Sequence, residues 1–362
     1  MFLINFRIKN PVAGNTTLTP KELKYITDSF KKNYREPFFN GPDNVKISAY
    51  QLQLFYSYLY VINDDAIKRY GKEDEYTIYS KDTVDILFKS YYEQTYIAFL
   101  RVILRISNPM QKYYGVKFDI YPSGKIKPEF FSEIYVSKTK KRMVELDGKM
   151  RPIYRMASIE VIEPYIHWQT VDTCLLKEHY NGDQKELKLY IQFHTIIRMK
   201  ERLDILDQGD INQLLIEGIK KMEPFEVYKN HLLLPVVIAN KKIGYWLVSI
   251  IEDYLLLRTF LLISQNNTPE GDKLQELSGL IKEDMKYWQM DRLSTFIELN
   301  KEENPILTQL LKDAGLESLL QIDKNLVEMD LAENQNNLEG LEKYIQQGLQ
   351  AIKGYNEEEI QH

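Results

Sequence analysis

The hydrophobic pattern between residues 187 and 274 predicts a strand, two helices and a three-strand meander. A short apolar run, Leu189–Phe193, leads directly into polar and apolar residues at helical spacing. A second helix is expected at Asp210–Met222. Three further apolar runs, each of strand length, predict the meander: Leu232–Ala239, Ile243–Ile251 and Tyr254–Ile263.

The preceding residues change from helical to alternating spacing. Thr19-Pro20 opens a predicted helix ending near Tyr34, and helical spacing recurs over residues 48–70 and 80–107. Short alternating runs follow from Val116 onwards. Asp147-Gly148 predicts a tight hairpin turn, because both residues tolerate positive φ.

Helical spacing returns after Thr268-Pro269, which predicts a helix continuing toward Trp288. Further helices are expected from Asn304-Pro305, at residues 316–322 and at residues 338–352. The fold class is therefore α+β. We expect a helical N-terminal region at residues 1–110, a β-rich region at 111–186, the α+β unit at 187–274 and a helical acidic region at 275–362.

The amino-acid composition indicates a globular protein. With 44% hydrophobic and 27% charged residues, the chain has the balance of a globular protein. Its single cysteine, Cys174, cannot form an internal disulfide and is expected to be buried in a strand. The most apolar window is interrupted by charges, so no membrane span is expected and we predict a cytoplasmic protein.

Charge is unevenly distributed along the chain. Residues 300–362 contain 13 acidic and 5 basic side chains, which is typical of a solvated helical tail. The densest basic run is Lys138–Arg142, interpreted either as a solvated loop edge or as a loop facing phosphate. No dinucleotide-binding or Walker motif is present, so no small-molecule cofactor is expected, and the spacing of His167 and His179 matches no metal motif, so no metal site is expected.

The candidate chemistry lies in the predicted α+β unit. His194, Arg198 and Arg202 are spaced by four residues and share one helix face. Arg258 interrupts the apolar row Tyr254, Leu256, Phe260, Leu262 and needs an anionic partner or a wet cleft.

If the meander packs against that helix, these side chains converge. Guanidinium groups match phosphate oxygens, and an imidazole of pKa about 6.5 can move a proton near neutral pH. Asn267-Thr268, at a predicted helix start, adds backbone N–H groups as a phosphate-binding element.

The order of these motifs resembles small domains of the RelE/colicin ribonuclease superfamily. The resemblance depends on His194-x3-Arg198-x3-Arg202 after a strand, on Arg258-Thr-Phe-Leu in the last strand, and on Thr268-Pro-Glu-Gly. It covers about residues 187–274. It implies a RelE-like, metal-independent and toxin-like ribonuclease with His194 as general acid or base and with Arg198, Arg202 and Arg258 on the phosphate.

A structural interpretation of the same residues stays open. Arg198 and Arg202 could pair with Glu201, Asp204 or Asp207, and Arg258 could clamp an interior carboxylate. The chain would then be a non-catalytic scaffold or protein-interaction module. The expected partner is accordingly RNA or a protein.

Overall fold

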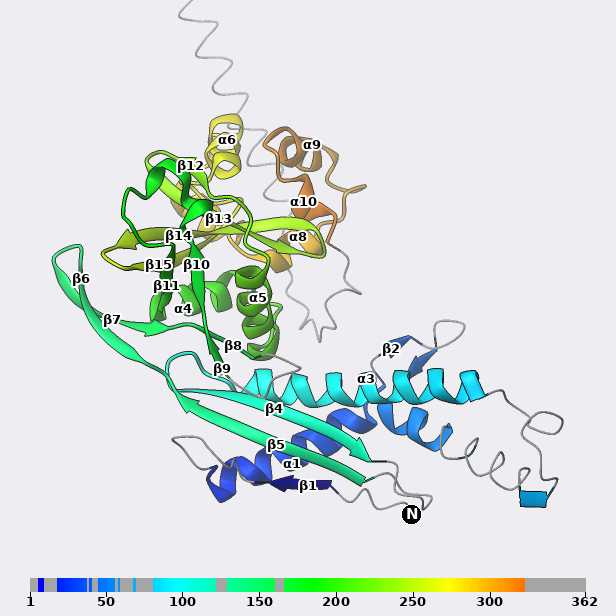
Figure 1. Cartoon of the computed structure of the whole chain (residues 1–362). Helices are drawn as coiled ribbons and strands as arrows, with labels where there is room; N and C mark the ends of the chain where they lie inside the picture. The colour runs from blue at the N-terminus through cyan, green and yellow to red at the C-terminus, as the bar shows by residue number, and fades with distance from the viewer. Residues whose placement is uncertain are drawn as a thin grey trace, which may run out of the picture. The chain divides into compact units, whose positions relative to one another are not determined.

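The computed structural model describes residues 6–9, 18–37, 39–40, 45–55, 58, 68–69, 81–121, 129–159 and 166–322. The chain has an α+β fold that divides into two compact units. Unit 1 comprises Met1–Thr139 and Ala157–His167, and unit 2 comprises Lys140–Met156 and Trp168–His362. The predicted β-rich region therefore contributes strands to both units (Figure 1).

Two helices form the core of unit 1. α1 (Pro20–Arg35) and α3 (Lys81–Ile106) pack together, with the rings of Phe30 and Phe99 at 5.1 Å between centroids. Thr19 starts α1 in a capping box with Glu22, as the sequence predicts. Helical residues also occur at 49–55, within the predicted helix at 48–70, whose remaining residues lie partly outside the described ranges.

A three-stranded sheet accompanies these helices. β5 (Glu129–Lys138) lies between β1 (Phe6–Lys9), which is parallel to it, and β4 (Lys112–Tyr121), which is antiparallel. The carboxylate of Glu22 accepts hydrogen bonds from Lys112 and Tyr114, tying α1 to β4 and lowering the pKa of Glu22 to about 2. Two short ladders complete the described strands outside the large sheet: β2 (Phe39–Asn40) with β3 (Lys46–Ile47), and β8 (Ala157–Ile159) with β9 (Ile166–Trp168).

Unit 2 is built on a mixed sheet in the order β12-β13-β14-β15-β11-β7-β6, with β10 paired to β11. β11 and β15 are parallel neighbours, and the other pairs are antiparallel. The strands are β6 (Lys141–Leu146), β7 (Lys149–Arg155), β10 (Thr170–Asp172), β11 (Glu186–Gln192), β12 (Glu226–Tyr228), β13 (His231–Ile238), β14 (Lys241–Ile251) and β15 (Tyr254–Leu262).

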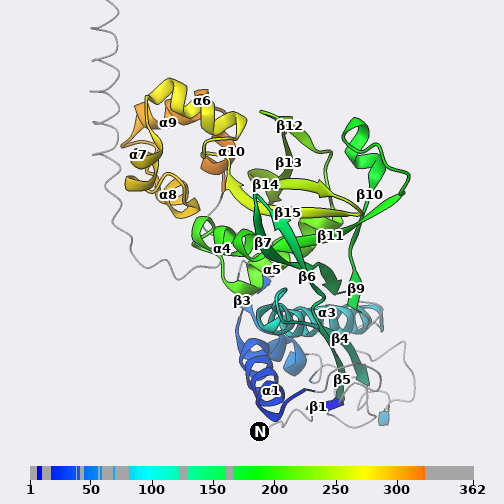
Figure 2. The same cartoon turned by 90° about the vertical axis from the view of Figure 1, so that its left-hand side faces the viewer.

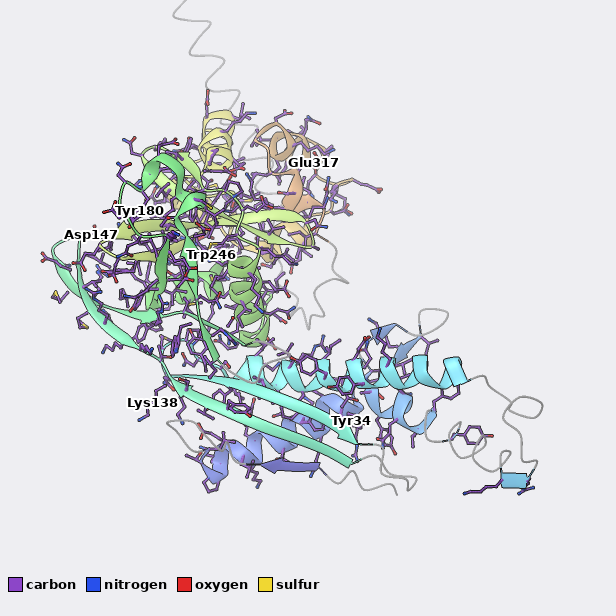
Figure 3. All side chains as sticks on the ribbon, viewed as in Figure 1. Tyr34, Lys138, Asp147, Tyr180, Trp246 and Glu317 are labelled. Carbon is purple, nitrogen blue, oxygen red and sulfur yellow. The ribbon has the colours of Figure 1, made fainter. Side chains whose placement is uncertain are left out.

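Two helices cover one face of this sheet. α4 (Phe193–Arg202) and α5 (Gln208–Lys220) lie along β14 and β15 in both views (Figures 1 and 2). The buried Trp246 of β14 donates its indole N–H to the sulfur of Met199 in α4 at 3.4 Å. Its ring also lies so close to Gly218 of α5 that any Cβ there would collide with it. Figure 3 shows Trp246 in the interior of unit 2.

The β6–β7 hairpin forms one edge of the sheet. Asp147 and Gly148 form its turn with φ of 52° and 72°, which confirms the predicted hairpin. Inward-facing hairpin residues pack on β11 and β15 in one hydrophobic cluster. Its members are Val144, Leu146, Ile153, Tyr190, Tyr254 and Leu256.

The C-terminal helices are shorter than predicted. The helix expected to continue toward Trp288 is two helices, α6 (Pro269–Ser278) and α7 (Lys282–Tyr287). Gly279 separates them because it adopts a left-handed conformation, φ 70°, which ends an α-helix. They are followed by α8 (Leu293–Glu298), α9 (Pro305–Asp313) and α10 (Glu317–Leu320). The predicted helix at 338–352 lies outside the described residues.

The expectation of a buried Cys174 is wrong. Cys174 is exposed in the 3-10 helix η2 (Thr173–His179), which follows β10. The carboxylate of Asp172 accepts the backbone N–H of Cys174 and so starts this helical turn instead of continuing the strand. Among the described residues, the helices are too short or too polar to cross a bilayer.

We expect Trp246→Ala to lower the free energy of unfolding by about 3–5 kcal/mol, because it removes a fully buried indole between the sheet, α4 and α5. Urea denaturation followed by circular dichroism measures this change. Tyr287→Ala serves as control, because Tyr287 is 77% exposed and its loss should change stability by about 0.5 kcal/mol or less. Equal stability of the two variants would contradict the assigned core.

Candidate functional site

The candidate site is centred on the point where β11 ends and α4 begins. Gln192, the N-cap residue of α4, makes no side-chain cap, and the first turn of α4 contains no acidic residue. The first backbone N–H groups of a helix carry a partial positive charge that favours anions. The start of α4 is therefore electrostatically suited to a phosphate.

The register of the sheet brings Arg258 to this point. Ile191 of β11 pairs with Leu257 of β15 in the parallel ladder, so Arg258 follows at the same sheet end as Gln192. Ligands in open α/β sheets commonly bind at the carboxyl ends of parallel strands. The predicted proximity of the last meander strand to the His194 helix is thus present in the backbone.

A β-bulge changes the environment predicted for Arg258. In the β14–β15 ladder Leu247 pairs with Thr259 and Val248 with Leu257, which leaves Arg258 as the extra residue. Arg258 therefore does not continue one row from Leu256 to Phe260, because the bulge shifts the alternation. Leu256 packs under the hairpin, whereas Phe260 pairs with Trp246 on the face covered by α4 and α5.

Arg258 has an anionic partner within the chain. Its Nη2 donates to the carboxylate of Asp147 at 2.5 Å. Asp147 is not an interior carboxylate: it lies at the hairpin tip with 68% of its side chain exposed (Figure 3). An exposed pair of this kind contributes about 0–1 kcal/mol, so an incoming phosphate can compete for the guanidinium.

His194 and Arg198 lie on the exposed side of α4. Arg198 donates from Nε to Nε2 of His194 at 3.3 Å, and from Nη1 to Glu201 at 2.5 Å. The predicted stacking along one helix face is confirmed for this pair, and so is the alternative pairing of Arg198 with Glu201. Partial burial of the ring lowers the pKa of His194, and the positive charges of Arg198, Arg202 and Arg151 lower it further, against the opposing charge of Glu201. The imidazole is therefore neutral at pH 7.

Arg202 is the half-buried end of this row. Its Nη1 is buried and makes no hydrogen bond with any of the described residues. Burial and the neighbouring Arg198 lower the pKa of Arg202 to about 10, while Asp291 and Glu201 oppose that shift. The guanidinium is charged at pH 7, and its buried Nη1 is a donor without an acceptor among the described residues.

The predicted phosphate-binding element at Asn267-Thr268 is occupied by the chain itself. The hydroxyl of buried Thr268 donates to the carbonyls of Ile263 and Gln265 and accepts the N–H of Gly271. The N–H of Asn267 donates to Asp272 at 3.1 Å. These bonds already satisfy the hydroxyl of Thr268 and the N–H groups of Asn267 and Gly271, which a bound phosphate would otherwise use.

Sequence reasoning missed Arg151 and Asp291. Arg151 lies on β7, which pairs with β11 up to Ile153–Gln192 and contacts α4. The positive charge of Arg151 lowers the pKa of His194, and the negative charge of Asp291 raises that of Arg202. Neither residue stands in a recognisable motif, and both come near α4 through contacts between distant parts of the chain.

Comparisons of the chain with protein-family models, with curated proteins and with solved structures found no match. The function must therefore be argued from the geometry of the α4 site.

Proposed function

We propose that the chain is a metal-independent ribonuclease that binds an RNA phosphodiester at the start of α4. The observation that carries the proposal is the row of one neutral imidazole and two guanidinium groups on α4, ending in Arg202, whose Nη1 has no acceptor among the residues that the structure describes. Arg258 and Arg151 approach the same end of the sheet from β15 and β7. The resemblance to RelE-like ribonucleases supports the same assignment.

In this proposal His194 is the general base. Its Nε2 removes the proton of a ribose 2′-hydroxyl, whose oxygen attacks phosphorus while the bond from phosphorus to the 5′ oxygen breaks. The 5′ oxygen takes a proton from water, and the imidazolium returns its proton to solvent. Arg198, Arg202 and Arg258 stabilise the charge that develops on the phosphoryl oxygens. The 3.3 Å bond from Arg198 to His194 is long, so the bound phosphate can draw this guanidinium away.

A specific observation also favours the second candidate, a non-catalytic scaffold or protein-interaction module. Arg198 pairs with Glu201, and Arg258 pairs with Asp147, as expected if these arginines serve structure alone. This alternative leaves the buried Nη1 of Arg202 without an explanation. It predicts that RNA remains intact in the presence of the protein.

Incubation of the purified full chain with total RNA in the presence of EDTA tests the proposal. The expected result is cleavage, with fragments ending in 2′,3′-cyclic phosphate, as required by attack of the 2′-hydroxyl. Intact RNA overturns the ribonuclease assignment and leaves the scaffold function.

The pH dependence of cleavage gives a separate prediction. The general base must be unprotonated, and neighbouring guanidinium charges and burial lower the pKa of His194. We therefore expect the rate to fall in acid with a midpoint below the ordinary histidine value of about 6.5 and to be at its plateau at pH 7. Rates measured on a short labelled oligonucleotide from pH 4 to 8 give the midpoint of this fall. A midpoint above 6.5 would contradict His194 as the base in this electrostatic setting.

A further inference from the structure

β6 forms an open edge of the large sheet. The sheet order ends at β6, which is paired with β7 and with no other strand among the described residues. In a hairpin with a two-residue turn, the residues that flank the turn exchange backbone hydrogen bonds, and so does every second pair after them. The bond from the N–H of Arg155 to the carbonyl of Lys140 belongs to this series. The backbone N–H and C=O groups of Lys141, Met143 and Glu145 therefore point away from β7.

The other edge of the same sheet is protected against further pairing. β12 contributes three residues there, and β13 behind it contains Pro235 and a register shift between Val236 and Val237. Short strands, prolines and bulges are common means by which a sheet edge avoids pairing with another chain. β6 has six residues in continuous register with β7 and contains neither proline nor bulge. Of the two edges, that of β6 is open to a further strand.

The side chains of β6 alternate between two faces of the hairpin. Arg142 lies on the inner face and is paired with acidic residues of the β14–β15 turn, and Val144 of the same face belongs to the core cluster. Lys141, Met143 and Glu145 share the outer face. Met143 is 46% exposed, and no ion pair joins Lys141 or Glu145 to another described residue. The outer face thus has an apolar centre with one positive and one negative charge at equal distances on either side.

This arrangement is self-complementary about Met143. If a second β6 pairs antiparallel with Met143 opposite Met143, each Lys141 lies opposite the Glu145 of the other copy. Opposite charges at such cross-strand positions attract, whereas a parallel pairing in register would place like charges opposite one another. The two central methionines then bury apolar surface against each other, beside exposed Met150 and half-buried Pro152 of β7. Charge complementarity therefore identifies a second copy of the chain as the occupant of this edge.

We propose that two copies of the chain associate through β6, forming a two-fold dimer in which the large sheet continues from one copy into the other. Two-fold pairing uses the same surface on both copies and leaves no open β6 edge for a third. Two paired strands of this length bury less surface than a standard protein interface, so the dimer dissociates on dilution. The proposed dimer is independent of the ribonuclease assignment and goes beyond it.

Size-exclusion chromatography with light scattering tests the proposal on the full chain over a range of concentrations. We expect the apparent mass to rise toward twice that of one chain as the concentration increases. Met143→Pro should remain monomeric, because it removes an N–H group that pairs with the second copy and that β7 does not use. Circular dichroism establishes that this variant is folded.

Exchange of the two charges tests the register of the pairing. Lys141→Glu and Glu145→Lys should each abolish the dimer, because each places like charges opposite one another at both ends of the paired strands. The variant that carries both substitutions should dimerise again. Within one chain the two positions lie about 13 Å apart along the strand, so this recovery cannot arise inside a single copy. Lys149→Glu makes the same change of net charge on β7 and is the matched control, which should leave the dimer intact.

A chain that is monomeric at every concentration overturns the proposal. A dimer that persists in Met143→Pro and in both single charge variants also overturns it, since the interface would then lie on another surface. Loss of the dimer in the single charge variants without recovery in the double variant rejects the pairing about Met143. If Met143→Pro does not fold, the charge variants decide alone, because recovery in the double variant shows that the fold is kept.

Discussion

His194→Ala is expected to lower the rate of RNA cleavage by about 10²- to 10⁴-fold, the usual contribution of a general base. The imidazole stands at the start of α4 with Arg198 donating to its Nε2, and it is neutral at pH 7 because its pKa is lowered. Alanine removes the proton acceptor without removing the arginines. Initial rates on a labelled oligonucleotide under single-turnover conditions measure this loss directly.

The appropriate control is Lys200→Ala. Lys200 is an exposed cation on the same helix, six residues from His194 and therefore on a different side of α4. Its removal should change the cleavage rate little, apart from a general electrostatic effect. His194 is also exposed, so both variants should unfold at the same urea concentration as the original chain. Equal cleavage by the two variants would remove His194 from the mechanism.

Several elements of unit 2 were predictable because they depend on local sequence. The apolar runs identify β11, β13, β14 and β15 to within three residues at each end, and Asp147-Gly148 identifies the hairpin turn. The spacing of His194 and Arg198 predicts their contact, because side chains four residues apart are neighbours on an α-helix. These predictions need no knowledge of which strands are neighbours.

Strand order and register could not be read from the sequence. β11 is hydrogen-bonded to β7 and β15, both distant in the chain, and this pairing brings Arg258 and Arg151 to the start of α4. The bulge at Arg258 leaves no sequence signal, since neither glycine nor proline marks it, and it reverses the face predicted for Phe260. The sequence correctly predicts a helix start at Thr268-Pro269. It does not predict that the hydroxyl of Thr268 is bonded to carbonyls of the preceding turn, because those bonds depend on how that turn folds.

Arg202→Met is expected to separate function from stability. Arg202 is half-buried, its Nη1 has no acceptor among the described residues, and its pKa of about 10 keeps it protonated at pH 7. Methionine fills a similar volume and leaves no buried donor without an acceptor, so the free energy of unfolding should be unchanged or rise by about 1–3 kcal/mol. Loss of a preorganised donor to the phosphate should lower cleavage by about 10²- to 10³-fold.

Two further readouts distinguish a phosphate-binding arginine from a structural one. Because Arg202 helps to lower the pKa of His194, any residual cleavage by Arg202→Met should lose activity in acid at a higher pH than the original chain. Arg202→Lys keeps the positive charge but loses the planar guanidinium. Its cleavage rate should therefore fall in acid at the same pH as in the original chain, while cleavage stays slow. A methionine variant that is strongly destabilised, with its remaining activity unchanged per folded molecule, would show that Arg202 holds the C-terminal helices through Asp291 and does not bind phosphate.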